Sequence, residues 1–459
     1  MIYFLIMPIL SLAIDHNSAA GQDRRWVRNM NRIRADIPAP FPIDIDKVEQ
    51  AGLRIIESKH LTLYTDILPN GKIDALPELF DRCVPQWCQH FDVDPDQARL
   101  WKMRGFLISD RSAFGKFRQA GLVPADLPDF LAGYQTGHDF WWFLQPGQYY
   151  TRHLMIHEGT HAFMQWFLGG YGAPWFSEGL AELFGSNRLS DGKLTIRYRI
   201  QDRSEAEYWG RVKRIRDERG TANEMSLEDV LDIQANAFRQ VRNYGWSWAA
   251  CDFFSQHELT RKAFRELKNR VGKVSNTAFN QSFKSAVARH WQALERDWQI
   301  FLSEIDYGYE IERGRLIDAE VIQSDPIHQK VKIRTDQSWQ MTGLKVRAGE
   351  RFSVNAKGQF QVGSTQTEQG QVPWISEANG VTIEYYQGAP LGILKLGILD
   401  DTQPSAKQKI AGLIDNQSFG KTKTWVAKQS GMLCLRINES PAHLEDNFGT
   451  LEVTLEKLK

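Results

Sequence analysis

The pentapeptide HEGTH at residues 157–161 constrains this chain more than any other feature of its sequence. On an α-helix, residues four apart share a face, so His157 and His161 can bind one metal ion while Glu158 lies beside the open coordination position. The flanking residues are strongly apolar, and polar side chains on such a helix are costly to bury unless a partner such as zinc satisfies them. The spacing therefore predicts a buried helix that carries a zinc site with its own general base.

A third zinc ligand has to come from elsewhere, because a catalytic zinc ion usually takes three protein ligands and keeps one position for water. The segment PWFSEGLAE follows at residues 174–182. We expect the first helix to end at residues 169–170, and Ser177 to cap a second helix that starts at Glu178. Glu178 is then the third ligand. Glu182, four residues later on the same face, accepts the free ring N–H of a ligating histidine and fixes its orientation.

Composition and charge exclude several classes of partner. The 459 residues include 56 basic and 56 acidic side chains, so the net charge is zero, and no block of Lys or Arg creates a local positive field. We therefore expect no nucleic acid and no anionic membrane surface as a partner. The length predicts two to three domains, and the 15 Trp, 13 Tyr and 25 Phe predict large, well-packed cores.

The N-terminus resembles an export signal. Residues 1–14 are a compact apolar run, too short to span a bilayer, and small residues at 18–20 suit cleavage after Ala20. No Lys or Arg precedes the run, so a misassigned start codon and a buried first strand are the alternatives. We predict a secreted or periplasmic bacterial protein with no membrane span in the mature chain. Residues 21–50, which are basic and then Pro-rich, are predicted as a linker or arm.

The cysteines do not predict a disulfide scaffold. There are four, which is too few for such a fold. Cys83 and Cys88 lie five apart in a predicted helix and point in diverging directions unless Pro85 breaks it. Cys251 and Cys434 lie in apolar runs, so buried thiols are expected.

Residues 51–307 combine a few strand patterns with many helical ones. Strands are predicted at 59–65, 104–109 and 138–144, and helices at 75–91, 114–119, 252–267 and 279–305. These patterns predict a small sheet backed by helices. The strand at 138–144 directly precedes the zinc helix. We place it at the sheet edge, where it could pair with the backbone of an extended substrate, although an ordinary sheet strand with no role in substrate binding is the favoured interpretation.

The pattern changes near residues 308–320. Six short alternating runs with turn signals follow, at 330–334, 352–356, 381–385, 392–398, 432–437 and 451–455. They predict an all-β sandwich. The predicted fold class is therefore α+β: a mostly helical metal-binding domain with a small sheet at 51–307, followed by a sandwich at 308–459.

The HExxH motif together with Trp175-x-x-Glu178-Gly-x-Ala-Glu182 resembles the gluzincin metallopeptidases, in particular the bacterial peptidase MA-like group. The resemblance covers roughly residues 59–305 and implies a zincin-like, thermolysin-type catalytic domain. The residues to which it assigns roles are the zinc ligands His157, His161 and Glu178, the base Glu158 and the supporting carboxylate Glu182.

These families also carry a downstream tyrosine or histidine that stabilises the oxyanion of the reaction. Tyr244, in the segment RNYGWSWAA at 242–250, resembles that tyrosine, which in this group opens a helix of similar composition. A packed core tyrosine is the alternative.

Residues 308–459 resemble the bacterial galactose-binding, calcium-dependent PA-I-like lectins. The likeness rests on WQMTGLKV at 339–346, GERFSV at 349–354, PLGIL at 390–394 and LRINE at 435–439. It implies a calcium site with oxygen donors from Glu439, Asp446 and Asn447, and a saccharide ligand. The sugar-contacting segment of the lectin is replaced here by SEANG at 376–380, so the fold is better supported than galactose binding. An acidic surface loop is the alternative for the calcium site.

Together these patterns predict an exported zinc metallopeptidase that acts on proteins or peptides and carries a carbohydrate-binding-like module, with Zn²⁺ and Ca²⁺ as cofactors. A non-catalytic surface or carbohydrate-binding protein with a structural zinc site is the alternative. Glu158 argues against it, because a structural site needs no base and is usually closed by four ligands. Hydrolysis of a bond other than a peptide bond also stays open, since the motif specifies activated water and not the acyl group.

Overall fold

The computed structural model describes residues 16–322 and 328–458, and the chain divides into two compact units. Unit 1 contains residues 1–145 and 158–167, and unit 2 contains 146–157 and 168–459. Most of the predicted leader, residues 1–15, lies outside the described residues. Helix α1 (His16–Ile33) runs through the predicted cleavage position at Ala20, and much of the predicted arm is helical. Among the described residues, no helix is both long and apolar enough to cross a membrane.

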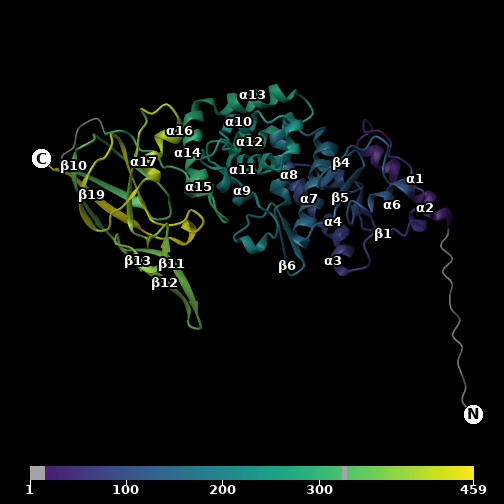
Figure 1. Ribbon diagram of the computed structural model, residues 1–459, viewed down its shortest axis with the longest axis horizontal. Coiled ribbons are helices and arrows are strands. Elements are labelled where there is room, and N and C mark those ends of the chain that lie inside the picture. Colours follow the sequence, from purple (N-terminus) through teal and green to yellow (C-terminus); the bar gives the residue numbers. More distant parts are fainter. Residues whose placement is uncertain (1–15, 323–327, 459) are drawn as a thin grey trace, which may run out of the picture. The chain divides into compact units, whose positions relative to one another are not determined.

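Unit 1 contains a five-stranded sheet in the order β1-β2-β3-β5-β4. Figure 1 labels β1, β4 and β5 of this sheet. The strands are β1 (Arg54–Glu57), β2 (Leu61–Thr65), β3 (Met103–Ile108), β4 (Gly133–Thr136) and β5 (Asp139–Phe143). The central strands β2, β3 and β5 run parallel and are buried at every residue, as expected for parallel strands covered on both faces. The three strands predicted from the sequence are confirmed.

The prediction that residues 138–144 form the edge strand is wrong. β5 lies between β3 and β4 and is hydrogen-bonded on both sides. The edge is β4, a four-residue antiparallel strand that carries no strand pattern of its own. Alternation along one segment predicts a strand but not its neighbours, so strand order was not accessible from periodicity. A buried ion pair between Arg104 and Asp139, with Nε–Oδ1 at 2.6 Å and Nη2–Oδ2 at 2.8 Å, joins β3 to β5.

Helix α4 (Leu76–Phe91) contacts β2 and carries two of the cysteines. The helix continues through Pro85 without a break. All four cysteines are free and buried, so the prediction of buried thiols is confirmed.

The part of unit 2 that precedes the sandwich is mostly helical. Its longer helices are α8 (Pro174–Gly185), α9 (Arg211–Glu218), α11 (Arg242–Gln256), α13 (Asn276–Val287) and α14 (Trp291–Glu304). α8 and α11 pack closely at Gly179, where an added methyl group would overlap the Cys251 sulfur and the Ser247 backbone. A glycine is therefore required next to Glu178.

Three helix predictions in this region differ from the structure. The helix predicted at 279–305 is two helices, α13 and α14, separated by a 3₁₀ turn at 288–290. α8 starts at Pro174 rather than at Glu178, because proline lacks the N–H that a first helical residue leaves unpaired, and Ser177 is consequently inside the helix and not its cap. The predicted helix at 252–267 is two helices, since α11 ends at Gln256 and α12 (Arg261–Glu266) follows a turn in which His257 Nδ1 accepts a hydrogen bond from the Leu259 N–H.

The C-terminal region is rich in sheet, and the α+β fold class is confirmed in this general sense. Two four-stranded antiparallel sheets, β17-β10-β19-β8 and β16-β15-β18-β9, share one apolar core. The strands are β8 (His328–Arg334), β9 (Gln340–Val346), β10 (Arg351–Lys357), β15 (Leu394–Leu399), β16 (Gln417–Ser418), β17 (Thr422–Val426), β18 (Gly431–Ile437) and β19 (Thr450–Leu458). Shorter pairs, β11 (Phe360–Thr367) with β12 (Gly370–Ser376) and β13 (Val381–Tyr386) with β14 (Ala389–Leu391), complete the region.

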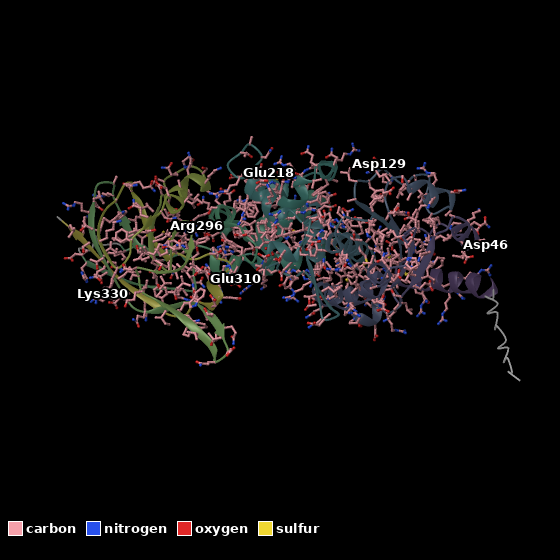
Figure 2. The ribbon with its side chains drawn as sticks, turned by 60° about the horizontal axis from the view of Figure 1, so that its bottom comes forward. Asp46, Asp129, Glu218, Arg296, Glu310 and Lys330 are labelled. Carbon is pink, nitrogen blue, oxygen red and sulfur yellow. The ribbon has the colours of Figure 1, made fainter. Side chains whose placement is uncertain are left out.

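Unit 2 includes both the helices and the sandwich, with no division near residue 308. A second apolar cluster contains Ile300 of α14 and Trp339 next to β9. A buried ion pair joins Arg436 of β18 to Glu304 of α14, with Nη1–Oε1 at 2.7 Å. Not every charged residue of the sandwich is buried in this way: Lys330 of β8 is exposed to solvent (Figure 2). Helices and sandwich therefore share buried contacts, which an isolated fragment starting at 308 would expose.

Candidate metal centre

Helix α7 (Gln148–Phe163) carries the HEGTH motif and is continuous, although the division between the units falls at its residues 157 and 158. It is buried from His153 through Met164, as the apolar flanks predict. It continues as one π-helical turn (Met164–Leu168), and Gly169, with φ of +89°, follows that turn. The chain then turns into α8 at Gly169 and Gly172, which both have a positive φ. Glycine adopts this conformation readily because it has no Cβ.

The structure brings His157, His161 and Glu178 together. One ligand atom from each lies within 4.8 Å of the other two, and His157 Nε2 is 3.3 Å from Glu178 Oε2. A tetrahedral ion with bonds of about 2.1 Å separates its ligand atoms by about 3.4 Å, so this spacing fits zinc. The two histidines are buried and Glu178 is partly exposed. Two imidazoles and one carboxylate are also the donor set of several catalytic zinc sites.

Glu158 lies on α7 between the two histidines and is only 5% exposed. Gly133 of the edge strand β4 lies against it, since a methyl group added at Gly133 would overlap the Glu158 carboxylate. The backbone of β4 therefore runs beside this carboxylate. Sequence analysis missed this glycine because β4 has no motif.

Glu182 is fully buried and connects the cluster to other charges. Its Oε1 is 3.4 Å from His157 Nδ1, on the opposite side of the ring from Glu178. Arg211 of α9 donates to both Glu182 oxygens, from Nε at 2.9 Å and from Nη2 at 2.8 Å. Burial alone would raise the pKa of Glu182, but Arg211 and His153 hold it well below its usual value. Glu182 is therefore an anion that can accept the His157 Nδ1–H and leave Nε2 for a metal ion.

Arg211 and His153 have no role in the sequence predictions. Arg211 lies 29 residues beyond Glu182 on another helix, and no spacing rule connects the two. His153 is one helical turn before His157, is fully buried, and has its Nε2 3.4 Å from Glu182 Oε2. The i, i+4 spacing of His153 and His157 was the signal that could have drawn attention to it.

His153, His157 and Glu182 form a second group that could hold a metal ion, and it shares His157 with the first. Arg211 decides between the two groups. Its guanidinium already occupies both Glu182 oxygens, and a divalent cation at the same carboxylate would face an adjacent positive charge in a buried environment. The group formed by His157, His161 and Glu178 is therefore the better metal site.

Tyr244 is the third residue of α11, which starts at Arg242, well before the helix predicted at 252–267. The centroid of its ring lies 6.0 Å from the centroid of the His157 ring. The Tyr244 ring also packs edge to face against Phe238, with the centroids 5.1 Å apart. The Arg211 guanidinium lies 5.9 Å from the same ring. The structure thus brings Tyr244 to the side of the metal cluster.

The three oxygen donors predicted in the sandwich differ in exposure. Glu439 and Asn447 are buried, whereas Asp446 is exposed at the end of a short helix (Leu444–Asp446). Burial raises the pKa of Glu439 to about 8, and the charge of Asp446 adds to the shift. Asn447 donates through Nδ2 to the Thr335 carbonyl, while its buried Oδ1 finds no hydrogen-bond partner within the described part of the chain.

Comparison of the sequence with models of known protein families gives no match, and comparison with curated proteins gives none either. Solved structures include two weak similarities. One is the EclA N-terminal domain, a PllA-like lectin, with 18% identity, a TM-score of 0.21, and coverage of 28% of this chain and 96% of that domain. The other is PliG of Aeromonas hydrophila, a periplasmic inhibitor of g-type lysozyme, with 8% identity, a TM-score of 0.18, and coverage of 31% and 97%. Since both TM-scores are below 0.5, neither similarity supports an argument about this chain.

Proposed function

We propose that this chain is a zinc-dependent metallopeptidase in which His157, His161 and Glu178 hold the metal and Glu158 is the general base. One observation carries the proposal: three ligand atoms of the right types lie within 4.8 Å of one another, on the helix turn that also carries a buried glutamate. A site that only stabilised the fold would need no such base and would be closed by a fourth ligand.

The residues around the metal have separate tasks in the proposed reaction. A bound zinc ion would lower the pKa of a water molecule in its open position and polarise the substrate carbonyl. Glu158 takes the proton of that water and returns it to the leaving amine. Tyr244 donates a hydrogen bond to the oxygen that becomes negatively charged. Glu182, itself held by Arg211, keeps the His157 ring in one orientation.

A peptide substrate is favoured by the edge strand next to the base. β4 is antiparallel to β5 and has no strand on its other side in the sheet order, so an extended chain could pair with it. Gly133 would then bring that chain close to Glu158. β4 thus takes the role that we had expected for residues 138–144.

Incubation of the purified protein with a proteome-derived peptide library, with and without a chelator, tests the proposal. We expect cleavage that the chelator abolishes and added zinc restores. Elemental analysis should find about one zinc ion per chain. Cleavage that persists after complete removal of the metal would contradict the proposal.

Export and a ligand-binding sandwich complete the proposal. Export rests on the apolar run at 1–14 and is tested by sequencing the N-terminus of the protein recovered from the periplasm or medium. For the sandwich, the buried and unpartnered Asn447 Oδ1, together with Glu439, supports a calcium site that also includes Asp446. A saccharide could complete its coordination, and a glycan array with and without calcium tests for such binding.

A further inference from the structure

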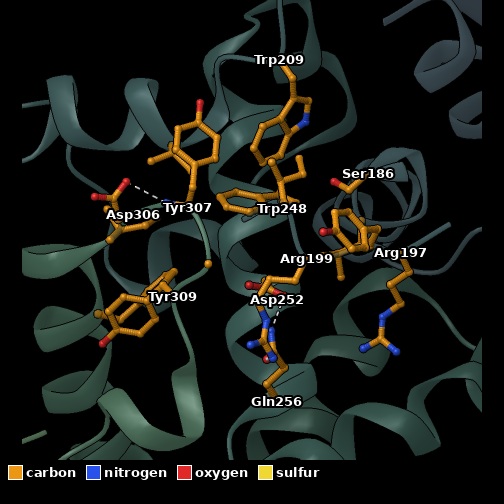
Figure 3. Close-up of a pocket in the computed structure, with 17 residues that line it drawn as sticks. Ser186, Arg197, Arg199, Trp209, Trp248, Asp252, Gln256, Asp306, Tyr307 and Tyr309 are labelled. Carbon is orange, nitrogen blue, oxygen red and sulfur yellow. Dashed lines mark hydrogen bonds between the residues drawn. The ribbon is translucent and has the colours of Figure 1, made fainter. Parts of the chain in front are cut away.

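One cavity in unit 2 involves none of the proposed zinc ligands. It encloses about 260 Å³, and its walls include residues of α8, α9 and α11 and the segments 197–200 and 305–309 (Figure 3). This volume is just below the roughly 300–1,000 Å³ of pockets for drug-sized ligands, so it suits a smaller molecule.

One part of the cavity is aromatic. Trp209 and Trp248 meet edge to face with ring centroids 4.9 Å apart, and Tyr307 lies 6.3 Å from Trp209 (Figure 3). Trp209 is only 3% exposed, yet its buried Nε1 has no hydrogen-bond acceptor in the described ranges.

The other part carries charges of both signs, on the exposed Arg197 and the half-buried Asp252. Arg197 and Asp252 line the cavity and influence each other electrostatically, but neither forms an ion pair within 4.0 Å with any residue that the structure describes. Gln256 donates a hydrogen bond from Nε2 to Asp252 Oδ1 at 2.5 Å and accepts one from Arg199 (Figure 3). These two contacts hold the Asp252 carboxylate in position. Arg197 has a φ of +54°, a left-handed conformation that is rare for a residue with a side chain. Such strained residues cluster at functional sites.

We propose that this cavity binds a free α-amino acid with an apolar, preferably aromatic, side chain. The carboxylate of the amino acid would pair with Arg197 and its ammonium group with Asp252, while its side chain packs against Trp209, Trp248 and Tyr307. A zwitterion neutralises both charges at once, which a neutral sugar of the same size does not. The site stands independently of the proposed peptidase activity, because no residue of the zinc cluster lines the cavity.

Isothermal titration of the full-length protein with L-phenylalanine and L-tryptophan tests the proposal. We expect saturable binding, and at least about tenfold weaker binding of N-acetyl-L-phenylalanine, which lacks the ammonium group, and of L-phenylalaninamide, which lacks the carboxylate. Glycine should bind more weakly than L-phenylalanine, since it leaves the aromatic wall uncovered. Equal binding of the amino acid and its two analogues, or preferential binding of a monosaccharide, would overturn the proposal, and so would no binding at millimolar concentration.

Two variants assign the charges separately. Arg197→Gln should weaken L-phenylalanine binding while making the protein indifferent to loss of the ligand carboxylate, and Asp252→Asn should do the same for the ammonium group. Lys193→Gln, at an exposed position of the β6–β7 hairpin (Asn187–Ser190 and Lys193–Ile196), is the matched control and should bind normally. Thermal melts identify any variant that fails to fold. Because L-phenylalanine carries both charges, a folded Arg197→Gln with wild-type affinity and wild-type discrimination against the amide would exclude Arg197 as the carboxylate partner.

Discussion

The metal cluster on α7 and α8 and the oxygen cluster of the sandwich are built in opposite ways. In the first, the ligands come from two consecutive helices, and a buried arginine holds the carboxylate behind them in its charged form. In the second, Glu439 follows β18, whereas Asp446 ends a short 3₁₀ helix and Asn447 follows it. Burial raises the pKa of Glu439 to about 8, although the Ser440 N–H, which donates to its Oε1, and Arg436 oppose this shift.

The contrast shows what a preorganised metal site requires. At Glu182 the protein itself provides a positive charge, on Arg211, that keeps the buried carboxylate ionised before any metal binds. Metal binding therefore does not have to supply the free energy of ionising this buried group. At Glu439 the cation itself would have to supply the positive charge. The first site should therefore bind its metal far more tightly than the second, and the predictions below test this difference.

The largest expected effect follows from Glu158→Gln. The amide keeps the size of the side chain but cannot accept a proton, so peptide cleavage should fall by about 10³-fold or more while zinc content stays near one per chain. Elemental analysis and cleavage rates measure the two quantities. Glu49→Gln, which changes an exposed glutamate of α2 (Ile45–Gln50), is the control and should leave both unchanged. Loss of zinc from Glu158→Gln would show that Glu158 is a ligand and not the base.

Metal titration should separate Glu178 from Glu182. Glu178→Ala removes a ligand and should abolish tight zinc binding, whereas Glu182→Gln should lower the affinity by about ten- to a hundredfold. Equal effects of the two changes would overturn the assignment.

The Arg211 contact adds a second readout to this comparison. Glu182→Gln leaves the buried Arg211 without its counter-ion, which is expected to destabilise the fold by about 3–5 kcal/mol. The double variant Glu182→Gln with Arg211→Met removes both charges, so its melting temperature should lie above that of Glu182→Gln alone. A double variant that melts lower would show that Arg211 stabilises the fold through other contacts.

The sequence predicted those parts of the molecule that depend on local spacing. The positions of His157, His161 and Glu178 follow from helical periodicity and one short turn, and the structure brings the three together. Arg211, Gly133 and the order of β4 and β5 depend on which distant segments meet, and no motif or period encodes that. The helix start at Pro174 could have been predicted, because proline is common at the first position of a helix.

Gly133→Ala tests whether the edge strand serves the metal centre. The added methyl group would overlap the Glu158 carboxylate, so that side chain or β4 has to move. A displacement of about 1 Å in a catalytic geometry can reduce the rate by up to about 10²-fold, and zinc content should be unaffected because no ligand is touched. Gly137→Ala, at a glycine of the β4–β5 turn that has a φ of +54° and does not approach Glu158, controls for loss of stability. Cleavage at the wild-type rate in Gly133→Ala would remove β4 from the proposed substrate path.

The smallest effect is expected at the sandwich. Glu439, Asp446 and Asn447 offer three side-chain oxygens, fewer than the six to eight ligands of calcium, so water or a ligand hydroxyl has to complete the site and the affinity should be modest. If the dissociation constant lies near 10⁻⁴ M, as in extracellular calcium modules, millimolar calcium stabilises the native state by about 1–2 kcal/mol, which is a few degrees in melting temperature. Calorimetry of the zinc-loaded full-length chain measures this shift, and the full chain is needed because the sandwich shares buried contacts with α14.

Asn447→Leu should abolish the calcium effect, whereas Asp415→Asn, which changes an exposed acid elsewhere in the sandwich, should preserve it. A calcium shift that survives in Asn447→Leu would mean that calcium binds at another site. If calcium did not change the melting temperature of the wild-type protein, the cluster at Asn447 would not be a calcium site. The two clusters would then differ in function, since only the one on α7 and α8 would bind a metal ion.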